Sequence, residues 1–336
     1  MDPLTQGAVG AALPLATRRG KPAAVAAGCG FLAGLAPDLD ILLHDPDDTL
    51  LFLEFHRQFT HALIFIPVGS AIIAGALFGL ARRWLALGFF EIWLFCTLGY
   101  TTHGILDAAT SFGTLLLWPF SDMRFAFNIV SVIDPLFTMP VAGLVLASIL
   151  RKDHRWARGA LGWAALYLAL GTLQHHAALS MANALAEDRG HVPTRLVAKP
   201  TFGNILLWRT IYETADRFHV DAVRPGPWAR SFTGTQVDKL DLKRDFPWLK
   251  PGSQQARDIL RFRRFSQNFN AKAPDGSNRV IDVRYGFLPT EISALWSIKL
   301  DREAGPQVHA VYETDRSNAR AQLPRLFDMV FGSLPD

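Results

Sequence analysis

Long apolar stretches fill the first half of the chain. Residues 62–80 contain no charged side chain at all. Three further stretches are interrupted only by isolated polar residues: 84–100 by Glu91, 129–150 by Asp134, and 159–186 by His175 and His176. A helix needs about 20 apolar residues to cross the hydrocarbon core of a bilayer. The pattern therefore predicts four membrane-spanning helices.

Two shorter apolar stretches come first, at residues 7–16 and 23–36. They predict a hairpin of short helices that either crosses the bilayer or re-enters on the same side. Its tip is predicted at Arg18-Arg19-Gly20-Lys21.

The pattern changes after residue 187. Stretches such as 280–285 and 309–312 alternate apolar and polar residues, and turn signals separate them at Pro225-Gly226, Pro251-Gly252 and Asp275-Gly276. The fold class predicted from these patterns is a polytopic all-α membrane domain of about four to six helices, residues 1–187, followed by a smaller soluble α+β domain, residues 188–336.

Positive residues orient the predicted helices. One set of loops holds most of them: Arg18, Arg19, Lys21, Arg82, Arg83, Arg151, Lys152, Arg155 and Arg158. The opposite set holds only Arg57 and Arg124. The positive-inside rule places the first set in the cytoplasm. We therefore expect a multi-pass protein of the bacterial inner membrane with an extracytoplasmic C-terminal domain.

Composition agrees with a membrane location. Hydrophobic residues make up 50% of the 336 residues and charged residues 19%, below the ~25% usual for soluble proteins. The net charge of +4 lies largely in the short loops, so membrane topology accounts for it and no nucleic-acid partner is expected. Cys29 and Cys96 lie in apolar stretches and form neither a disulfide framework nor a CxxC site.

Histidines and acidic residues gather on the predicted extracytoplasmic side. They are Asp38, Asp40, His56, His61, His103, Asp107 and Asp134. The spacing of His103 and Asp107 places both side chains on one helical face. Such a set, without thiols, is typical of an open site for a divalent metal, with zinc as the first choice and manganese as the alternative.

Each cluster also has a purely structural interpretation. Asp38 and Asp40 could mark a polar helix end, and His103 and Asp107 could share a hydrogen bond within a helix. A transporter or ion pathway would use intramembrane acids and histidines as well. A membrane-anchored binding protein is a further alternative, in which the histidines only support the fold.

Several short motifs together resemble one family. They are Met1-Asp2-Pro3-Leu4-Thr5-Gln6-Gly7, Gly34-Leu35-Ala36-Pro37-Asp38-Leu39-Asp40, His56-Arg57 with Thr60-His61, His103-Gly104-Ile105-Leu106-Asp107, Thr110-Ser111-Phe112-Gly113, Trp118-Pro119-Phe120 and Ile133-Asp134-Pro135. In order and spacing they resemble the YdjM-like family of inner-membrane proteins, described as metal-dependent hydrolases. That family is distantly similar to zinc-dependent phospholipase C and related nucleases. The resemblance covers roughly residues 1–185.

The resemblance implies a set of metal ligands or near-ligands: Asp38, His56, His61, His103 and Asp107. It implies supporting roles for Asp40 and Asp134. Many members carry His where this chain has Gln6, so one coordination position is expected to be missing or filled by water.

The function expected from these observations is hydrolysis of an ester or phosphoester by metal-activated water, with Asp40 or Asp107 as general base. Membrane lipids are the expected surroundings, and a lipid or lipid-linked molecule is the expected substrate.

Overall fold

The computed structural model describes residues 1–18, 22–85 and 87–332, with no account of the side chains in 81–86. Arg19, Gly20 and Lys21 of the predicted hairpin tip therefore lie outside the described residues. The chain forms two compact units, and each is assembled from separate stretches of sequence. Unit 1 contains Met1–Leu42, Phe55–Leu173 and Phe202–Asn204. Unit 2 contains Leu43–Glu54, Gln174–Thr201 and the chain from Ile205 onward.

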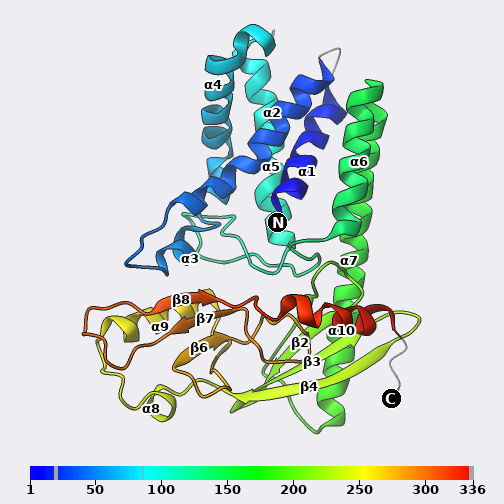
Figure 1. The fold of residues 1–336 in the computed structure, drawn as a ribbon. Helices are drawn as coiled ribbons and strands as arrows, with labels where there is room; N and C mark the ends of the chain where they lie inside the picture. Colours follow the sequence, from blue (N-terminus) through cyan, green and yellow to red (C-terminus); the bar gives the residue numbers. More distant parts are fainter. Residues whose placement is uncertain (19–21, 86, 333–336) are drawn as a thin grey trace. The chain divides into compact units, whose positions relative to one another are not determined.

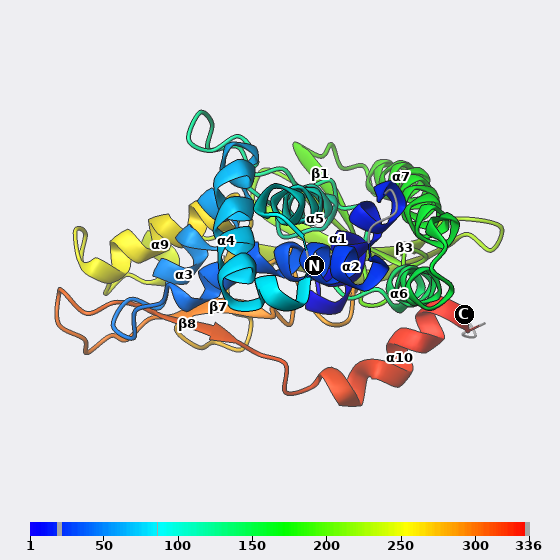
Figure 2. The same cartoon turned by 90° about the horizontal axis from the view of Figure 1, so that it is seen from above.

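Unit 1 is helical (Figure 1). Its helices are α1 (Pro3–Thr17), α2 (Ala23–Leu35), α4 (Ile66–Leu85), α5 (Phe89–Ala109), α6 (Pro135–Arg151) and the first part of α7 (His154–Asp188), with the 3₁₀ helices η1 (Ala36–Leu42), η2 (Phe59–His61) and η3 (Leu63–Phe65). Figure 2 shows several of these helices end-on, with α1 and α2 beside α5. Aspartates cap the N-termini of α1 and α6. The Asp2 side chain accepts a hydrogen bond from the backbone N–H of Thr5, and the Asp134 side chain accepts hydrogen bonds from those of Leu136 and Phe137.

Small residues let α1, α2 and α5 pack with their backbones in close approach. A Cβ atom added to Gly30 would lie 2.3 Å from the carbonyl oxygen of Gly10 in α1. A Cβ atom added to Gly99 in α5 would lie 2.3 Å from the Gly30 carbonyl oxygen. Packing of this kind is typical of helices that associate within membranes.

The prediction of a polytopic domain with four to six spanning helices was wrong. Among the described residues, only Ala23–Leu42 and Leu63–Leu80 are long and apolar enough to cross a membrane, and Pro135–Arg151 is a shorter apolar helix. The apolar stretch in α5 fills the interior of unit 1, where Ile92 and Cys96 are fully buried. An apolar run serves helix packing as well as it serves contact with lipid, so length and hydropathy alone did not distinguish the two.

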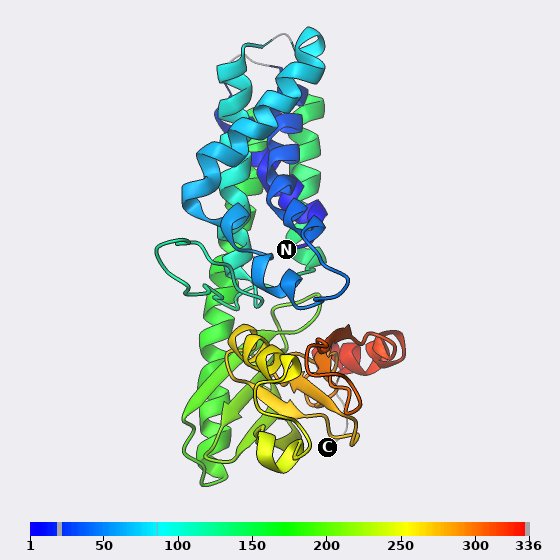
Figure 3. The same cartoon turned by 90° about the vertical axis from the view of Figure 1, so that its left-hand side faces the viewer.

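Unit 2 contains two four-stranded antiparallel sheets with the strand orders β1-β2-β3-β4 and β5-β6-β7-β8. Figure 3 shows strands of this unit as arrows. The strands are β1 (Arg195–Pro200), β2 (Trp208–Glu213), β3 (Arg217–Arg224), β4 (Arg230–Asp238), β5 (Asn270–Lys272), β6 (Arg279–Asp282), β7 (Trp296–Lys299) and β8 (Val311–Thr314). Its helices are α3 (Leu51–Phe55, of which Phe55 belongs to unit 1), the second part of α7, α8 (Leu242–Asp245), α9 (Gln254–Phe265) and α10 (Ala319–Phe331).

The core of unit 2 joins side chains of both sheets. Ile211, Phe218 and Val220 of the first sheet form one buried cluster with Ile281 of the second and the neighbouring Phe269. Trp208 of β2 contacts His175 of α7, and the hydroxyl of Tyr212 accepts from Arg189, which follows the last residue of α7. The composition changes at residue 187, whereas the division between the units falls within α7, at Leu173 and Gln174.

Candidate metal centre

Three short segments of unit 1 carry the residues of the site. The 3₁₀ helix η1 holds Asp38 and Asp40, η2 ends at His61, and the last two turns of α5 hold His103 and Asp107. Gly104 permits α5 to approach η2, because a Cβ atom there would lie 2.6 Å from the carbonyl oxygen of His61.

Four ligand atoms converge between these segments. Nε2 of His61 lies 3.3 Å from Oδ1 of Asp38 and 3.3 Å from Oδ2 of Asp107. Nε2 of His103 lies 3.4 Å and 3.5 Å from the same two oxygens. The two imidazole Nε2 atoms are 2.9 Å apart. In a tetrahedral zinc site with bonds of about 2.0–2.1 Å, neighbouring ligand atoms lie about 3.3–3.4 Å apart, so the four atoms have the spacing of a metal site.

Two carboxylate oxygens of this group are without a hydrogen bond of good geometry, although Oδ2 of Asp107 has an ion-pair contact with Arg57. Oδ1 of Asp38 and Oδ2 of Asp107 are buried and accept no hydrogen bond from the described residues. A buried carboxylate oxygen without a hydrogen bond is costly unless a cation compensates it. The side chains of His61, His103 and Asp107 are fully buried, whereas that of Asp38 is 29% exposed. The group is therefore least covered by protein on the side of Asp38.

Outer contacts orient both imidazoles. Nδ1 of His103 lies 2.6 Å from the carbonyl oxygen of Gly34, which can only accept, so Nδ1 carries a proton and neutral His103 presents a lone pair at Nε2. Nδ1 of His61 lies 2.9 Å from Oγ1 of Thr60, whose hydroxyl donates to Oδ2 of Asp40 at 3.0 Å. Such partners fix the ring orientation of metal-ligating histidines.

Asp107 is held by charged and polar neighbours. Nε of Arg57 lies 3.0 Å from its Oδ2, and the Gln6 amide donates to Oδ1 at 2.8 Å. The amino group of Met1 also contacts this carboxylate. Burial by itself raises the pKa of Asp107, but Arg57 and the other cations outweigh it and hold the pKa well below its ordinary value. Asp107 is therefore an anion.

The same carboxylates act on His103 in the opposite direction. Burial lowers the pKa of His103, but Asp107 and Asp38 outweigh it and raise the pKa to about 9. Without a metal ion, the second proton of His103 resides on Nε2, between the two carboxylates. A metal ion bound at this position would replace that proton.

Arg57 is a site residue that the sequence analysis did not assign. It is buried, it donates from Nη1 to Oγ1 of Thr110 at 3.1 Å, and its guanidinium lies 4.8 Å from the centre of the Phe112 ring. Its φ of 62° is in the left-handed region, which an arginine rarely adopts. Its place between His56 and His61 was the available signal, but the sequence does not reveal the direction of its side chain.

His56 pairs with Asp40 instead of joining the four ligands. Its Nδ1 lies 2.8 Å from Oδ1 of Asp40, whose Oδ2 accepts the backbone N–H of Arg57 at 3.0 Å. Asp38, Asp40 and His56 nevertheless form a second group with ligand atoms within 4.8 Å of one another. Burial lowers the pKa of His56, although Asp40 opposes this, so the imidazole is neutral at pH 7.

Asp134 does not join either group of ligand atoms. Its side chain caps α6, and both of its oxygens lie 2.9 Å from the hydroxyl of Tyr167.

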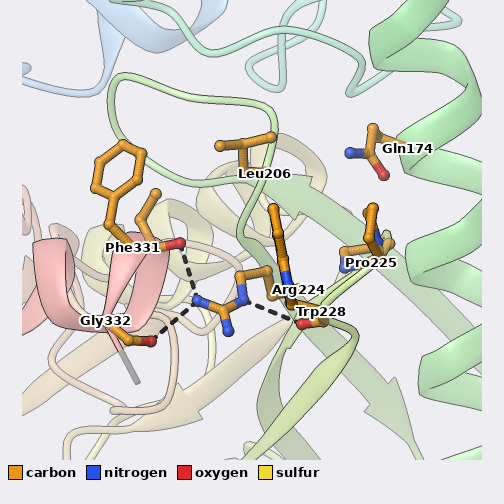
Figure 4. Close-up of a pocket in the computed structure, with 9 residues that line it drawn as sticks. Gln174, Leu206, Arg224, Pro225, Trp228, Phe331 and Gly332 are labelled. Atoms are coloured by element: carbon orange, nitrogen blue, oxygen red, sulfur yellow. Dashed lines mark hydrogen bonds between the residues drawn. The ribbon is translucent and has the colours of Figure 1, made fainter. Parts of the chain in front are cut away.

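A cavity of about 440 Å³ lies elsewhere, in unit 2. There Arg224 donates to the carbonyl oxygens of Trp228, Val330 and Gly332 (Figure 4).

The fold and the site define a two-unit protein whose helical unit holds a group of histidines and aspartates that could bind a metal ion. The sequence profile of the YdjM inner membrane protein family matches residues 1–178. The chain belongs to the YdjM inner membrane protein family, which confirms the resemblance and makes it an inner-membrane protein.

A curated relative supports the same location. The inner membrane protein YbcI of Escherichia coli (strain K12) is 34% identical over 101 residues, which cover 29% of this chain and 54% of that protein. The chain thus spans about half the length of this relative. No solved structure matches the chain.

Proposed function

We propose that this protein is a membrane-bound, metal-dependent hydrolase that acts on an ester or phosphoester. The observation that supports the proposal best is the convergence of His61, His103, Asp38 and Asp107 on one point, with two buried carboxylate oxygens lacking hydrogen bonds. These four residues would hold a divalent ion, zinc or manganese. When bound, such an ion lowers the pKa of water to about 7 and polarises the scissile group.

The general base is assigned to the pair of His56 and Asp40. Asp40 and Asp107 were the two carboxylates expected to act in general-base catalysis. Asp107 contacts Arg57 and lies at the proposed metal position, so Asp40 is the remaining candidate. Oδ1 of Asp40 accepts a hydrogen bond from the N–H at Nδ1 of His56. The other ring nitrogen, Nε2, is therefore the basic one in the neutral imidazole. His56 would take the proton from the attacking water at Nε2, and Asp40 would stabilise the imidazolium.

Arg57 provides positive charge beside the metal position. Its Nε atom already contacts the carboxylate of Asp107, a proposed ligand. A fixed guanidinium in a buried site stabilises negative charge that develops on the oxygens of a carbonyl or phosphoryl group. The leaving group would depart as an alcohol when its bond to that group breaks, taking up the proton that His56 holds.

Exposed apolar side chains around the ligands support a lipid or lipid-linked substrate. Leu39, Ile41 and Leu42 of η1 alternate with Asp38 and Asp40 and are all more than half exposed. In an inner-membrane protein, such side chains are suited to contact with acyl chains.

The test is elemental analysis of the detergent-purified protein after reconstitution with zinc or manganese, followed by assays on p-nitrophenyl esters and phosphoesters. We expect stoichiometric metal and hydrolysis in the wild type, and loss of both in the double variant His61→Ala/His103→Ala. The exposed His176 supplies the control His176→Ala, which should retain both. Absence of metal from the wild type, or full occupancy in the double variant, would exclude the proposed site.

A further inference from the structure

One segment between the ligands belongs to the other unit. Residues Leu43–Glu54, here called the strap, are part of unit 2. The chain leaves unit 1 after Leu42, two residues beyond Asp40, and returns at Phe55, directly before His56. The strap therefore joins the segment that carries Asp38 and Asp40 to the segment that carries His56 and His61.

Arg261 of α9 holds the strap on unit 2. Its Nη1 and Nη2 atoms donate to the two oxygens of Asp48 at 2.8 Å and 2.9 Å, and its Nε donates to Glu54 at 2.7 Å. Asp258, one turn earlier in α9, accepts from the same guanidinium at 3.1 Å and fixes its orientation. A guanidinium that binds a carboxylate through two parallel bonds provides both strength and direction.

The strap also pairs with β8 and buries apolar side chains. The backbone N–H of Tyr312 donates to Oγ1 of Thr49 at 2.8 Å, so the strap satisfies a donor at this strand, which ends its sheet. Leu50 and Leu53 are 1% and 2% exposed. The later part of the strap, from Asp48 onward, is thus held in unit 2 through Arg261 and Tyr312, whereas residues 43–47 are exposed.

The charges of this contact favour its ionised form. Burial alone would raise the pKa of Asp48, but Arg261 outweighs it and the pKa lies below its ordinary value. The side chains of Asp48 and Arg261 are each only 18% exposed, which protects the pair from screening by salt.

We propose that Arg261 is a positioning residue for the metal centre: it anchors the strap and thereby restrains the two ligand-bearing segments that the strap connects. This inference rests on the proposed metal site. At the two ends of the strap, Oδ1 of Asp40 and Nδ1 of His56 are 2.8 Å apart. An unanchored strap would sample many conformations, and the free energy needed to order it would be subtracted from metal binding. Unit 2 thereby acquires a role in the site, although most of its residues lie beyond the family match at residues 1–178.

The experiment measures the zinc Kd of the full-length protein in detergent, by competition with a chelator. Arg261→Met removes the guanidinium and keeps much of the side-chain volume. We expect the Kd to rise about tenfold, the lower end of the effect of outer-shell partners on metal sites. Arg261→Lys should lie between this variant and the wild type, because it retains the charge but not the two-bond geometry.

The matched control is Arg257→Met in the same helix. Arg257 is exposed, and its hydrogen bonds within the described part of the chain go to neighbours near the start of α9, Gly252 and Gln254. Its loss should leave the Kd unchanged. Hydrogen exchange of residues 43–56 should rise in Arg261→Met and not in Arg257→Met.

Asp48→Asn tests the same contact from the strap side and decides the question if Arg261→Met does not fold. A wild-type Kd in a variant whose strap exchanges rapidly would overturn the inference while the metal site stands. A wild-type protein without metal would instead overturn the proposed function.

Discussion

The two units bury ionisable side chains in contrasting ways. In unit 2, the guanidinium of Arg284 meets Asp282 at 2.7 Å and the carbonyl oxygen of Phe265 at 2.9 Å. Arg209 of the same unit donates from Nη1 and Nη2 to four carbonyl oxygens, although its Nε has no hydrogen-bond partner among the described residues. In unit 1, by contrast, Asp38 and Asp107 keep buried oxygens without a hydrogen bond; both face two imidazole nitrogens, and that of Asp107 also contacts Arg57.

We interpret this difference as one between structural support and the proposed metal site. A buried charge whose partners are complete holds chain segments in place and has no capacity left for a ligand. Other buried groups keep free acceptor positions. Where carboxylate oxygens and imidazole nitrogens with such positions lie side by side, they can coordinate a cation. The same residue types therefore have different roles, and the arrangement of their partners decides which.

The largest effect that sharpens the comparison is expected for Asp282→Ala in unit 2. It leaves Arg284 buried without its carboxylate, which costs about 3–5 kcal/mol of unfolding free energy. The metal content of the protein should not change, since Asp282 belongs to neither of the two groups of candidate metal ligands in unit 1. Denaturant unfolding followed by circular dichroism measures the loss.

Asp238→Ala is the control for that variant. Its carboxylate is 52% exposed and pairs with Arg217 and Arg244 at the surface, so we expect a loss of less than about 1 kcal/mol. Equal losses in the two variants would contradict the supporting role assigned to the buried pair.

A second prediction concerns pH and unit 1. The pKa of His103 is raised to about 9, so below that pH a metal ion competes with a proton on Nε2. Affinity for zinc should therefore rise by about tenfold for each pH unit between pH 6 and pH 8, as one proton is released on binding. Chelator competition at several pH values checks this slope. A flat profile would mean that His103 does not give up a proton to the metal.

The smallest effect is expected for Gln6→Met, which removes the amide that donates to Asp107 and keeps an unbranched side chain. We expect the zinc Kd to rise about tenfold, because Asp107 loses an orienting contact while Arg57 remains. Loss of all bound metal would instead assign Gln6 a direct place among the ligands. The double variant of His61 and His103 gives the reference for complete loss.

The sequence by itself determined the family and much of the site. The spacing of His103 and Asp107 places both on one face of α5, and their Nε2 and Oδ2 atoms lie 3.5 Å apart. Local spacing on a helix is fixed by backbone geometry, so it can be read without knowing the rest of the fold. The apolar stretches likewise predicted helices, but not which of them pack inside a protein unit.

The tertiary structure decided which histidine faces which carboxylate. His56 and His61 looked equivalent in sequence, yet the turn at Arg57 and the helix η2 direct His61 to the ligands and His56 to Asp40. It also decided that Asp134 caps α6 and that Arg261 binds the strap. These contacts join residues far apart in the chain, and no local pattern encodes the direction of a side chain across such a distance.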